Sequence, residues 1–436
     1  MISAWLAQRA AAAPDRILLS WPGGRHTYRE CLGLAGDLRR AHASRGDRPA
    51  GIESTSDVAF FLSLLALDGM ARRVFLLPQD AGAPLVMQLA ERHRFDLFDA
   101  SREEPQPKGG EAPAPVETEV VLFTSGTSGT PKAALHGWAS IAASIHTGEK
   151  LDGSRWLLTY SPTSYAGLQV FLHALLNGGQ LSFGPSRAGE LADLALRDQV
   201  THVSGTPTFY RLLLSTARPE TLAGLRWTQI TLGGEPVDQH ILDALRRRFP
   251  DAQITHVYAS TEAGVGFSVQ DGRAGFPARY LDTLGGDVGL RIVDGELQLR
   301  SRGAMRRYLD EPDPPREDAW LASGDLVQVD GDRVHFLGRN SDRINVGGSK
   351  LSPVEVEEVL RGIEGIRDAR VYGTPNPLTG QIVCADIVLA PEADAVEMRP
   401  RILAACRARL PAFKVPRILH FVDRLATTAA GKLVRG

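Results

Sequence analysis

The sequence has few cysteines and no spacing between them that marks a metal or redox site. Its 436 residues contain only Cys31, Cys384 and Cys406. No two of them lie close enough in the chain to form a zinc-binding or redox-active pair. We expect three free thiols, as in proteins of a reducing compartment, and therefore predict a cytoplasmic location.

The sequence also lacks a long apolar run and a strong net charge. The apolar stretch from Val58 to Leu67 ends at Asp68, well short of the roughly 20 residues that span a membrane. Residues 1–9 show no basic segment followed by an apolar one, so no signal peptide is expected. A net charge of −2 gives no electrostatic footprint for nucleic acid. We predict no membrane span and no nucleic-acid partner.

The length and the pattern of the chain predict more than one domain of mixed α/β structure. A chain of this size exceeds one ordinary hydrophobic core. Strand-like and helix-like segments alternate up to residue 258, which favours parallel sheets with active-site loops at the strand ends. Shorter strands follow from residue 289 and favour an antiparallel subdomain. We expect strands at 119–123, 156–160, 202–204, 229–232 and 254–258, and helices at 57–70, 170–176, 238–248 and 353–361.

The most informative segment is a polar loop that follows the first of these strands. It reads Thr124-Ser125-Gly126-Thr127-Ser128-Gly129-Thr130-Pro131-Lys132. Glycines let backbone N–H groups turn toward an anion, hydroxyls donate further hydrogen bonds, and the lysine adds positive charge. The spacing matches neither the common Gly-x4-Gly-Lys nucleotide loop nor a Gly-x-Ser-x-Gly nucleophile elbow. By itself the segment allows either a triphosphate-binding loop or a mobile linker.

Three further segments decide between these alternatives. They are Tyr258-Ala259-Ser260-Thr261-Glu262, then Ala322-Ser323-Gly324-Asp325 followed by Gly338-Arg339, and finally Ala429-Ala430-Gly431-Lys432. With the polar loop, their order and spacing resemble the adenylate-forming superfamily, which includes acyl- and aryl-CoA synthetases, luciferases and adenylation domains of peptide synthetases. The resemblance extends over nearly the whole chain. It implies a large body of parallel sheets, helices and a small antiparallel subdomain at 1–340, and a small α+β lid at 341–436.

The resemblance also implies a reaction. A carboxylic acid is activated with ATP and Mg²⁺ to an acyl-adenylate, and the acyl group is then passed to the thiol of coenzyme A. One alternative acceptor is the phosphopantetheine arm of an acyl carrier protein. A second alternative, a non-catalytic nucleotide-binding relative, is disfavoured because every motif keeps its key side chain.

Each motif residue takes a role from this resemblance. Thr261 would bond the α-phosphate, Glu262 would ligate Mg²⁺, and Lys432 would bridge the attacking carboxylate and the α-phosphate. Tyr258 would stack on adenine, Asp325 would hold the ribose, and Arg339 would help to hold the ribose or a phosphate. The remaining nucleotide contacts are assigned to Thr124, Ser125, Gly126, Thr127, Ser128, Gly129, Lys132, Gly233, Gly234 and Glu235.

The acid pocket is expected to take an aryl or aliphatic acid. Tyr165 stands where amino-acid-activating relatives keep an aspartate for the α-amine, so an α-amino acid is not expected. The pocket should include Ser164, Tyr165, Ala166, Gly167 and the segment Gly264 to Phe267, with residues 206–209 beside them. His256 is either a polar group of this pocket or a structural histidine.

Three positions depart from the superfamily pattern. Ala133 follows Lys132 where glycine is usual, Ser341 occupies the hinge position where Asp or Lys is usual, and Asn345 stands where many members carry Lys. The departures at Ser341 and Asn345 leave the timing of the lid open. The oligomeric state is also open, with a homodimer among the options.

Overall fold

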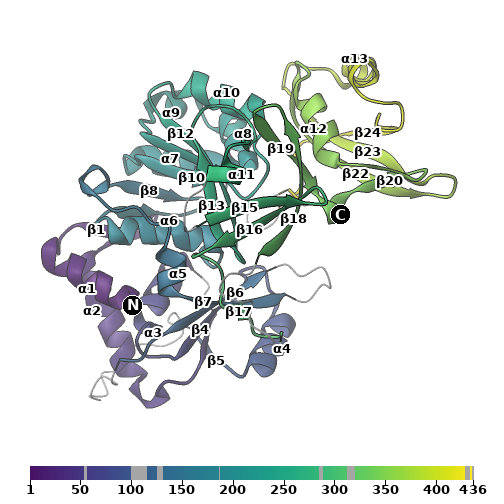
Figure 1. Cartoon of the computed structure of the whole chain (residues 1–436). Coiled ribbons are helices and arrows are strands. Elements are labelled where there is room, and N and C mark those ends of the chain that lie inside the picture. Colours follow the sequence, from purple (N-terminus) through teal and green to yellow (C-terminus); the bar gives the residue numbers. More distant parts are fainter. Residues whose placement is uncertain are drawn as a thin grey trace.

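The computed structural model describes residues 1–53, 56–99, 115–124, 131–185, 187–283, 288–311, 320–427 and 433–434. Figure 1 shows two sheets of the large body, one above the other, and a separate small sheet near the C-terminus. The lower, six-stranded sheet has the order β17-β7-β6-β4-β3-β5. Its strands are β3 (Ala50–Ile52), β4 (Arg73–Leu76), β5 (Asp96–Phe98), β6 (Glu119–Thr124), β7 (Lys132–Gly137) and β17 (Arg307–Tyr308).

An eight-stranded sheet forms the centre of the body. Its order is β13-β12-β11-β10-β8-β9-β1-β2, and every neighbouring pair from β12 to β1 is parallel. Consecutive parallel strands place their carboxyl ends on one edge, which gathers the loops that follow them. The strands are β1 (Ile17–Trp21), β2 (Gly24–Thr27), β8 (Arg155–Leu158), β9 (Gln180–Ser182), β10 (His202–Gly205), β11 (Gln229–Gly233), β12 (Gln253–Ser260) and β13 (Gly264–Val269).

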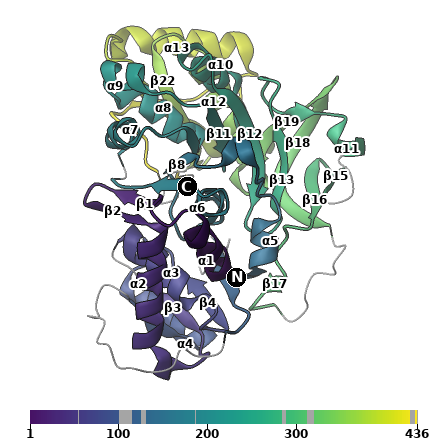
Figure 2. The ribbon, with the colours of Figure 1, turned by 90° about the vertical axis from the view of Figure 1, so that its left-hand side faces the viewer.

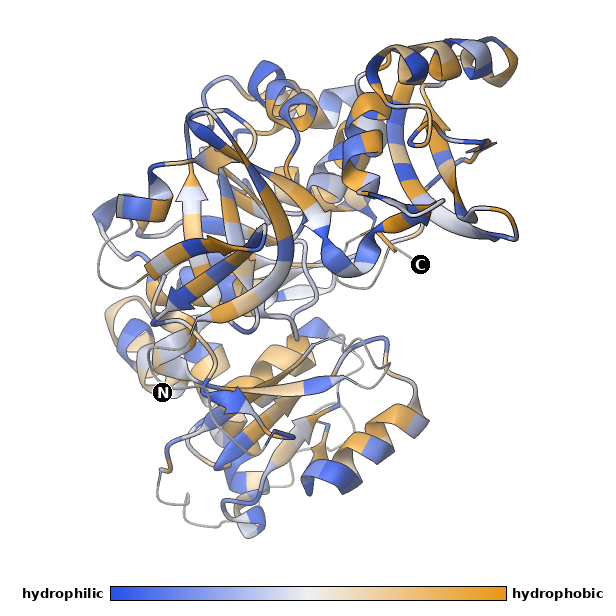
Figure 3. Ribbon diagram, turned by 45° about the vertical axis from the view of Figure 1, so that its right-hand side comes forward, coloured by the Kyte–Doolittle hydropathy of each residue, from blue (hydrophilic) through white to orange (hydrophobic). Residues whose placement is uncertain are grey.

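Two antiparallel-rich sheets complete the fold. The first, of order β14-β19-β18-β16-β15, continues the body, and the second forms the C-terminal unit. In Figure 3 hydrophobic and hydrophilic residues alternate along strands of the C-terminal sheet, as expected for strands with one face on a core. The strands are β14 (Phe276–Pro277), β15 (Val288–Val293), β16 (Glu296–Ser301), β18 (Leu321–Asp330), β19 (Arg333–Arg339), β20 (Ile344–Val346), β21 (Ser349–Leu351), β22 (Ile366–Asn376), β23 (Gly380–Leu389) and β24 (Ile418–Phe421).

Helices cover the sheets, and several begin at residues with capping side chains. Thr27 makes a full capping box with Glu30, and Ser164, Thr206 and Asp238 each accept a backbone N–H of the first helical turn. Figure 2 shows the C-terminal α13 at one end of the molecule and α2 to α4 at the other. The helices are α1 (Ile2–Ala12), α2 (Tyr28–Ala41), α3 (Asp57–Leu67), α4 (Ala83–His93), α5 (Trp138–Ala142), α6 (Tyr165–Leu176), α7 (Ala188–Arg197), α8 (Pro207–Thr216), α9 (Pro219–Gly224), α10 (Gln239–Arg248), α11 (Tyr280–Thr283), α12 (Pro353–Arg361) and α13 (Ala395–Arg409).

A buried group of charges joins the body to the C-terminal unit. Arg361, on α12, lies 2.9 Å from Asp368 and 3.4 Å from Glu357 within its own unit, and 3.6 Å from Asp238 of the body. Arg211 also pairs with Asp238. Burial tends to raise the pKa of Asp238, but attraction by Arg211 and Arg361 outweighs it and lowers that pKa. The network therefore holds ionised groups across the junction.

The predicted α/β fold class is confirmed, with differences at element ends. Helix α6 begins at Tyr165, five residues before the predicted start, because Ser164 caps it. Strand β8 ends at Leu158 and helix α3 at Leu67, both earlier than predicted. A cap made by one side chain outweighs apolar periodicity in setting where a helix begins.

Candidate active site

The polar loop connects two paired strands, β6 and β7. Thr124 and Lys132 face each other across this hairpin. The Lys132 ammonium lies 3.1 Å from the Glu311 carboxylate and 4.7 Å from the centre of the Tyr308 ring. Because this ion pair is half exposed, a phosphate could replace it at little cost. The predicted phosphate contacts Ser125, Gly126, Thr127, Ser128 and Gly129 lie outside the described residues.

Ala133, the first departure from the superfamily pattern, fits this hairpin. It is fully buried on β7 and belongs to the apolar cluster under α4. Its methyl group therefore points into the core, on the side of the strand away from Lys132 and its carboxylate partner.

The turn between β12 and β13 carries Thr261 and Glu262. The Tyr308 hydroxyl donates a 2.7 Å hydrogen bond to Glu262 Oε1, and the Met305 N–H donates to the Glu262 carbonyl. The His136 ring contacts the Thr261 carbonyl at 2.8 Å. Strands β7 and β17 of the six-stranded sheet thus fix a turn of the eight-stranded sheet, and the Tyr308 side chain contacts both Glu262 and Lys132.

His136 and Tyr308 were not predicted from the sequence. His136 is fully buried on β7, and burial lowers its pKa to about 4. The ring is therefore neutral near pH 7, and the carbonyl acceptor requires the proton on Nε2. Burial and the Glu262 carboxylate raise the pKa of Tyr308, which keeps its hydroxyl a donor. The only sequence signal is a histidine directly after the apolar run Ala133-Ala134-Leu135.

The residues around Glu262 fit a magnesium ion held largely by a nucleotide. Mg²⁺ prefers oxygen ligands and often takes one or two carboxylates together with substrate phosphates. Within the described part of the chain, no group of three or more His, Cys, Asp or Glu residues could hold a metal by itself. Tyr308 bonds one carboxylate oxygen of Glu262, which leaves the other oxygen as a ligand for the ion.

Tyr258 and Asp325 lie together, as the motif order implies. The Tyr258 hydroxyl donates a 2.5 Å hydrogen bond to Asp325 Oδ2, and Arg339 lies 3.5 Å from Asp325 Oδ1. The Tyr258 ring is nearly parallel to Phe267 and Phe336, with ring centres 5.4 and 5.1 Å away. Three motif residues from distant segments thus meet at one point, with the tyrosine orientation set by two aromatic neighbours.

Glu235 connects the body to the C-terminal segment. One carboxylate oxygen accepts from the Thr208 N–H at 3.1 Å, and the other accepts from the Leu433 N–H at 2.8 Å. Leu433 also forms a β-bridge with Thr427. Lys432 itself lies outside the described residues. Its neighbour Leu433 nevertheless lies against Glu235, next to the predicted adenine-lining Gly233 and Gly234.

A large cavity opens beside Gly233, Gly234 and Thr261. Its volume is about 1070 Å³, and its lining includes Thr261, Gly233, Gly234, Ser164 and Tyr165. The predicted pocket residues Gly167 and Gly264 are not among its lining residues. A Cβ on Gly167 would lie 2.1 Å from the Ser161 carbonyl, and a Cβ on Gly264 would lie 2.5 Å from the Gly303 carbonyl. Both glycines allow close backbone packing beside the cavity.

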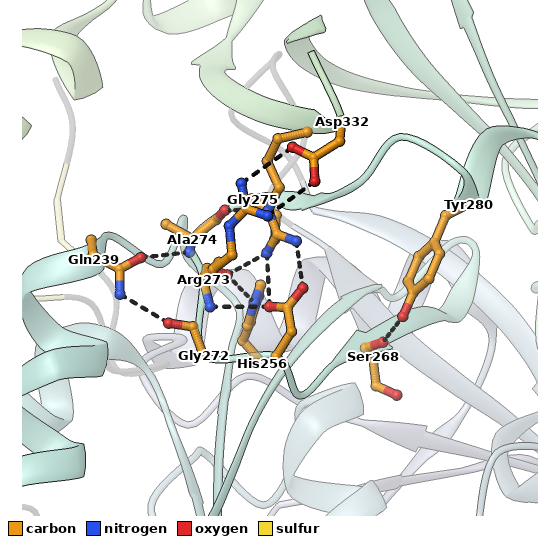
Figure 4. Close-up of polar contacts among 11 residues, drawn as sticks. Gln239, His256, Ser268, Gly272, Arg273, Ala274, Gly275, Tyr280 and Asp332 are labelled. Carbon is orange, nitrogen blue, oxygen red and sulfur yellow. Dashed lines mark hydrogen bonds and ion pairs between the residues drawn. The ribbon is translucent and has the colours of Figure 1, made fainter. Parts of the chain in front are cut away.

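Residues 206–209 and His256, which were also considered for the pocket, do not line the cavity. Thr208 faces the junction with the C-terminal unit. His256 lies on the opposite face of the sheet, where its Nε2 bonds the Arg273 carbonyl at 3.1 Å (Figure 4). The structural interpretation of His256 is therefore the correct one. Alternation along β12 gives the reason, because His256 and the cavity-lining Thr255 point to opposite faces.

Comparison with known proteins assigns the chain to a family. A model of AMP-binding enzymes matches residues 77–309, more than half of the chain, and a model of the AMP-binding enzyme C-terminal domain matches residues 355–432. The chain belongs to the AMP-binding enzyme family. The predicted family is thereby confirmed. The boundary at residue 340 stays a prediction.

Members of this family with known activities align over the full chain. A feruloyl-CoA synthase of Amycolatopsis sp is 29% identical over 100% of this chain and 98% of its own length. A 2-succinylbenzoate–CoA ligase of Bacillus cytotoxicus is 26% identical over 99% and 97%. These relatives support the prediction of an AMP-forming acid–thiol ligase with coenzyme A as the acceptor. An o-succinylbenzoate CoA synthetase of Bacillus subtilis has been solved with ATP and a magnesium ion, which agrees with the predicted ATP and Mg²⁺.

Solved structures of the family share the fold. An anthranilate CoA ligase in complex with anthranoyl-AMP superposes with a TM-score of 0.81 at 20% identity, covering 99% of this chain and 95% of that one. An o-succinylbenzoate CoA synthetase of Bacillus subtilis with its acyl-adenylate gives 0.76 at 21%, covering 99% and 96%. Across the described residues, no helix is both long and apolar enough to cross a membrane.

Proposed function

We propose that this AMP-binding enzyme activates an aryl or aliphatic carboxylic acid, but not an α-amino acid, and passes the acyl group to coenzyme A. Attack of the carboxylate on the α-phosphate of ATP gives an acyl-adenylate and pyrophosphate. The thiol then displaces AMP, which is a good leaving group. The observation that carries the proposal is the continuity of the cavity with Thr261, since this brings an acid to the residue assigned to the α-phosphate.

The residues of the chain divide the work between binding and orientation. Thr261 donates to the α-phosphate from a turn whose carbonyl is bonded by His136. Mg²⁺, when bound at Glu262, neutralises charge that develops on the phosphates. Lys132 holds the distal phosphates, and Lys432 is the cation between the reacting carboxylate and the α-phosphate.

Cavity composition supports an acid without an ammonium group. Among the lining residues that the structure describes there is no aspartate or glutamate, and Arg302 is the one lysine or arginine. A buried ammonium without a counterion is costly by several kcal/mol. The same composition tolerates aromatic and aliphatic bodies.

The acceptor is coenzyme A or, as the alternative, the phosphopantetheine arm of a carrier protein. Gly347 and Gly348 have φ of 59° and 86°, and a Cβ on either would meet no atom within 4 Å. The turn therefore leaves space for a narrow arm. Both acceptors present that arm, and the relatives, which are a CoA synthase and a CoA ligase, favour coenzyme A. We also propose a lid that begins at residue 341, on the short turn Asn340–Asp342, and a cytoplasmic location.

The experiment is ATP–pyrophosphate exchange with a panel of aryl, aliphatic and amino acids, followed by thioester formation with coenzyme A and with a pantetheinylated carrier protein. We expect exchange with aryl or aliphatic acids and thioester with coenzyme A. Absence of exchange with every acid, while nucleotide still binds, would favour a non-catalytic relative. Thioester formation on the carrier protein but not on coenzyme A would show that the carrier protein is the acceptor.

A further inference from the structure

The cavity extends far beyond the space that a small acid needs at Thr261. It runs along one face of the central sheet, from Gly233 at the carboxyl end of β11 to Gln229 at its amino end. Four residues of strand span about 13 Å. The volume of about 1070 Å³, which includes the space beside Gly233, Gly234 and Thr261 that is assigned to the nucleotide, slightly exceeds the roughly 300–1,000 Å³ of pockets that take drug-sized ligands.

The sheet face along this cavity is polar. Strand register places His202, Gln229 and Gln253 in one row across the sheet, and Ser204, Thr231 and Thr255 in the next. All six line the cavity. The opposite face carries Val203, Ile230, Leu232 and Ile254, which pack in an apolar cluster with helices α7, α8 and α10. Parallel strands covered on both faces are normally apolar throughout, so packing does not explain the two polar rows.

The hydrogen bonds between these two rows leave the hydroxyl protons of Thr231 and Thr255 available. Gln229 Nε2 donates to Thr231 Oγ1 at 3.1 Å and to Thr255 Oγ1 at 3.0 Å. A hydroxyl that accepts a hydrogen bond keeps its own proton to donate. Both threonines can therefore donate to an acceptor inside the cavity.

Helix α6 supplies two further polar atoms on the other wall. Tyr165 and His173 lie two turns apart, about 12 Å along the helix axis, and both line the cavity. His173 Nδ1 is buried and has no hydrogen-bond partner among the described residues, whereas the Tyr165 hydroxyl lies within hydrogen-bonding reach of Ser144 and the Val265 backbone. Unpaired buried polar atoms are rare in native proteins and point to a missing partner.

The far end of the cavity is flat and uncharged. Trp156 lies between two histidines, with its ring centre 4.7 Å from that of His173 and 4.6 Å from that of His202. Burial is the main cause that lowers the pKa of both histidines to about 4, so neither is charged near neutral pH. His146 and Arg302 also line the cavity but are exposed, at its rim. Such a wall suits an aromatic body and a neutral polar group better than a second carboxylate.

We infer that the acid substrate is elongated and carries, at the end opposite its carboxylate, a neutral hydrogen-bonding group such as a hydroxyl or a ketone. Its body crosses the polar sheet face, and its far group bonds polar atoms of that face, among them the hydroxyls of Thr231 and Thr255. This inference rests on the proposed function, because it concerns the acid whose carboxylate reacts at Thr261.

The test is ATP–pyrophosphate exchange with three matched acids: biphenyl carboxylate, the same acid with a hydroxyl at the far para position, and the same acid with a carboxylate there. We expect kcat/KM for the hydroxylated acid to exceed that of both others by about tenfold or more, because a site built for a hydroxyl rejects analogues without it. Equal values for the three acids, or rejection of all three while benzoate is exchanged, would overturn the inference.

Two variants localise the effect. Thr231→Val removes one hydroxyl at nearly constant volume and should bring the ratio of kcat/KM for the hydroxylated and plain acids close to one. The ratio is taken within each variant, so a general loss of activity does not imitate this result. Thr228→Val is the matched control, because the Thr228 side chain is exposed, bonds the Thr201 carbonyl and is not part of the cavity wall. An unchanged ratio in Thr231→Val would contradict the assignment.

The two proposals fail in different ways. Exchange with short aryl acids but no preference among the biphenyl acids would refute the inferred elongated substrate, while the proposed ligase activity would stand. Absence of exchange with any acid would refute the proposed ligase activity and, with it, the inferred substrate.

Discussion

Replacing Tyr308 by phenylalanine should weaken magnesium binding without disturbing Lys132. The Tyr308 hydroxyl donates to Glu262 Oε1 at 2.7 Å. A hydrogen bond to a charged group contributes about 1.5–3 kcal/mol, and tenfold in affinity corresponds to about 1.4 kcal/mol. The apparent affinity for Mg²⁺ should therefore fall about 10- to 100-fold, as is usual when a partner of a metal ligand is lost.

The assay is ATP–pyrophosphate exchange as a function of free Mg²⁺ at saturating ATP and acid, with calorimetric titration of MgATP as a second readout. Phenylalanine keeps the ring 4.7 Å from the Lys132 ammonium. Tyr308→Leu, which removes both ring and hydroxyl, is the comparison. It should also raise the KM for ATP at saturating Mg²⁺, whereas Tyr308→Phe should not.

An unchanged Mg²⁺ dependence in Tyr308→Phe would refute the reasoning, because it would mean that Glu262 either does not ligate the ion or needs no orientation. A rise in the KM for ATP at saturating Mg²⁺ in that variant would instead show that the hydroxyl itself contacts the nucleotide.

Four further predictions concern other parts of the molecule. Lys432→Ala should lose most of the overall activity from acid and ATP, because the lysine charge acts only in adenylation. The variant should still convert supplied acyl-adenylate and thiol to thioester at close to the parent rate. Equal loss of both half-reactions would refute a lid that presents Lys432 only for adenylation. Ser341→Pro should keep adenylation and lose thioester formation if the hinge lies at Ser341, because proline restricts φ. Proteinogenic amino acids should give no exchange, because Tyr165 replaces an amine-binding carboxylate; robust exchange with any of them would show the pocket assignment to be wrong. Arg361→Met should lower the free energy of unfolding in urea by about 3–5 kcal/mol, because it removes the cation that pairs with the buried Asp368 carboxylate, whereas Arg273→Met, at an exposed ion pair, should change it little.

The sequence predicts the motif residues because each motif is local. Tyr258, Asp325 and Arg339 carry their roles in short segments, and the structure brings them within hydrogen-bond or ion-pair distance. His136 and Tyr308 could not be predicted in the same way. Their contacts with Thr261 and Glu262 depend on β17 pairing with β7, two strands about 170 residues apart, and on the approach of a second sheet.

The polar sheet face was present in the sequence but was not recognised. In β10, β11 and β12, polar residues alternate with apolar ones, as in Gln229-Ile230-Thr231-Leu232. Such alternation predicts a strand with one face that does not join an apolar core. The sequence interpretation used these strands only as supports for the loops after them. It therefore included residues 206–209 in the pocket, beside the segments that begin at Ser164 and Gly264, but not the sheet face itself. The register between strands, which aligns the polar residues into rows, comes only from the fold.

The identity of the nucleotide product tests the central claim most directly. With a competent acid, coenzyme A, ATP and Mg²⁺, the purified protein should form AMP, pyrophosphate and thioester in equal amounts, because the acid attacks the α-phosphate. Formation of ADP and phosphate with the thioester would place the attack at the γ-phosphate and would contradict the assignment of Thr261, Glu262 and Lys432.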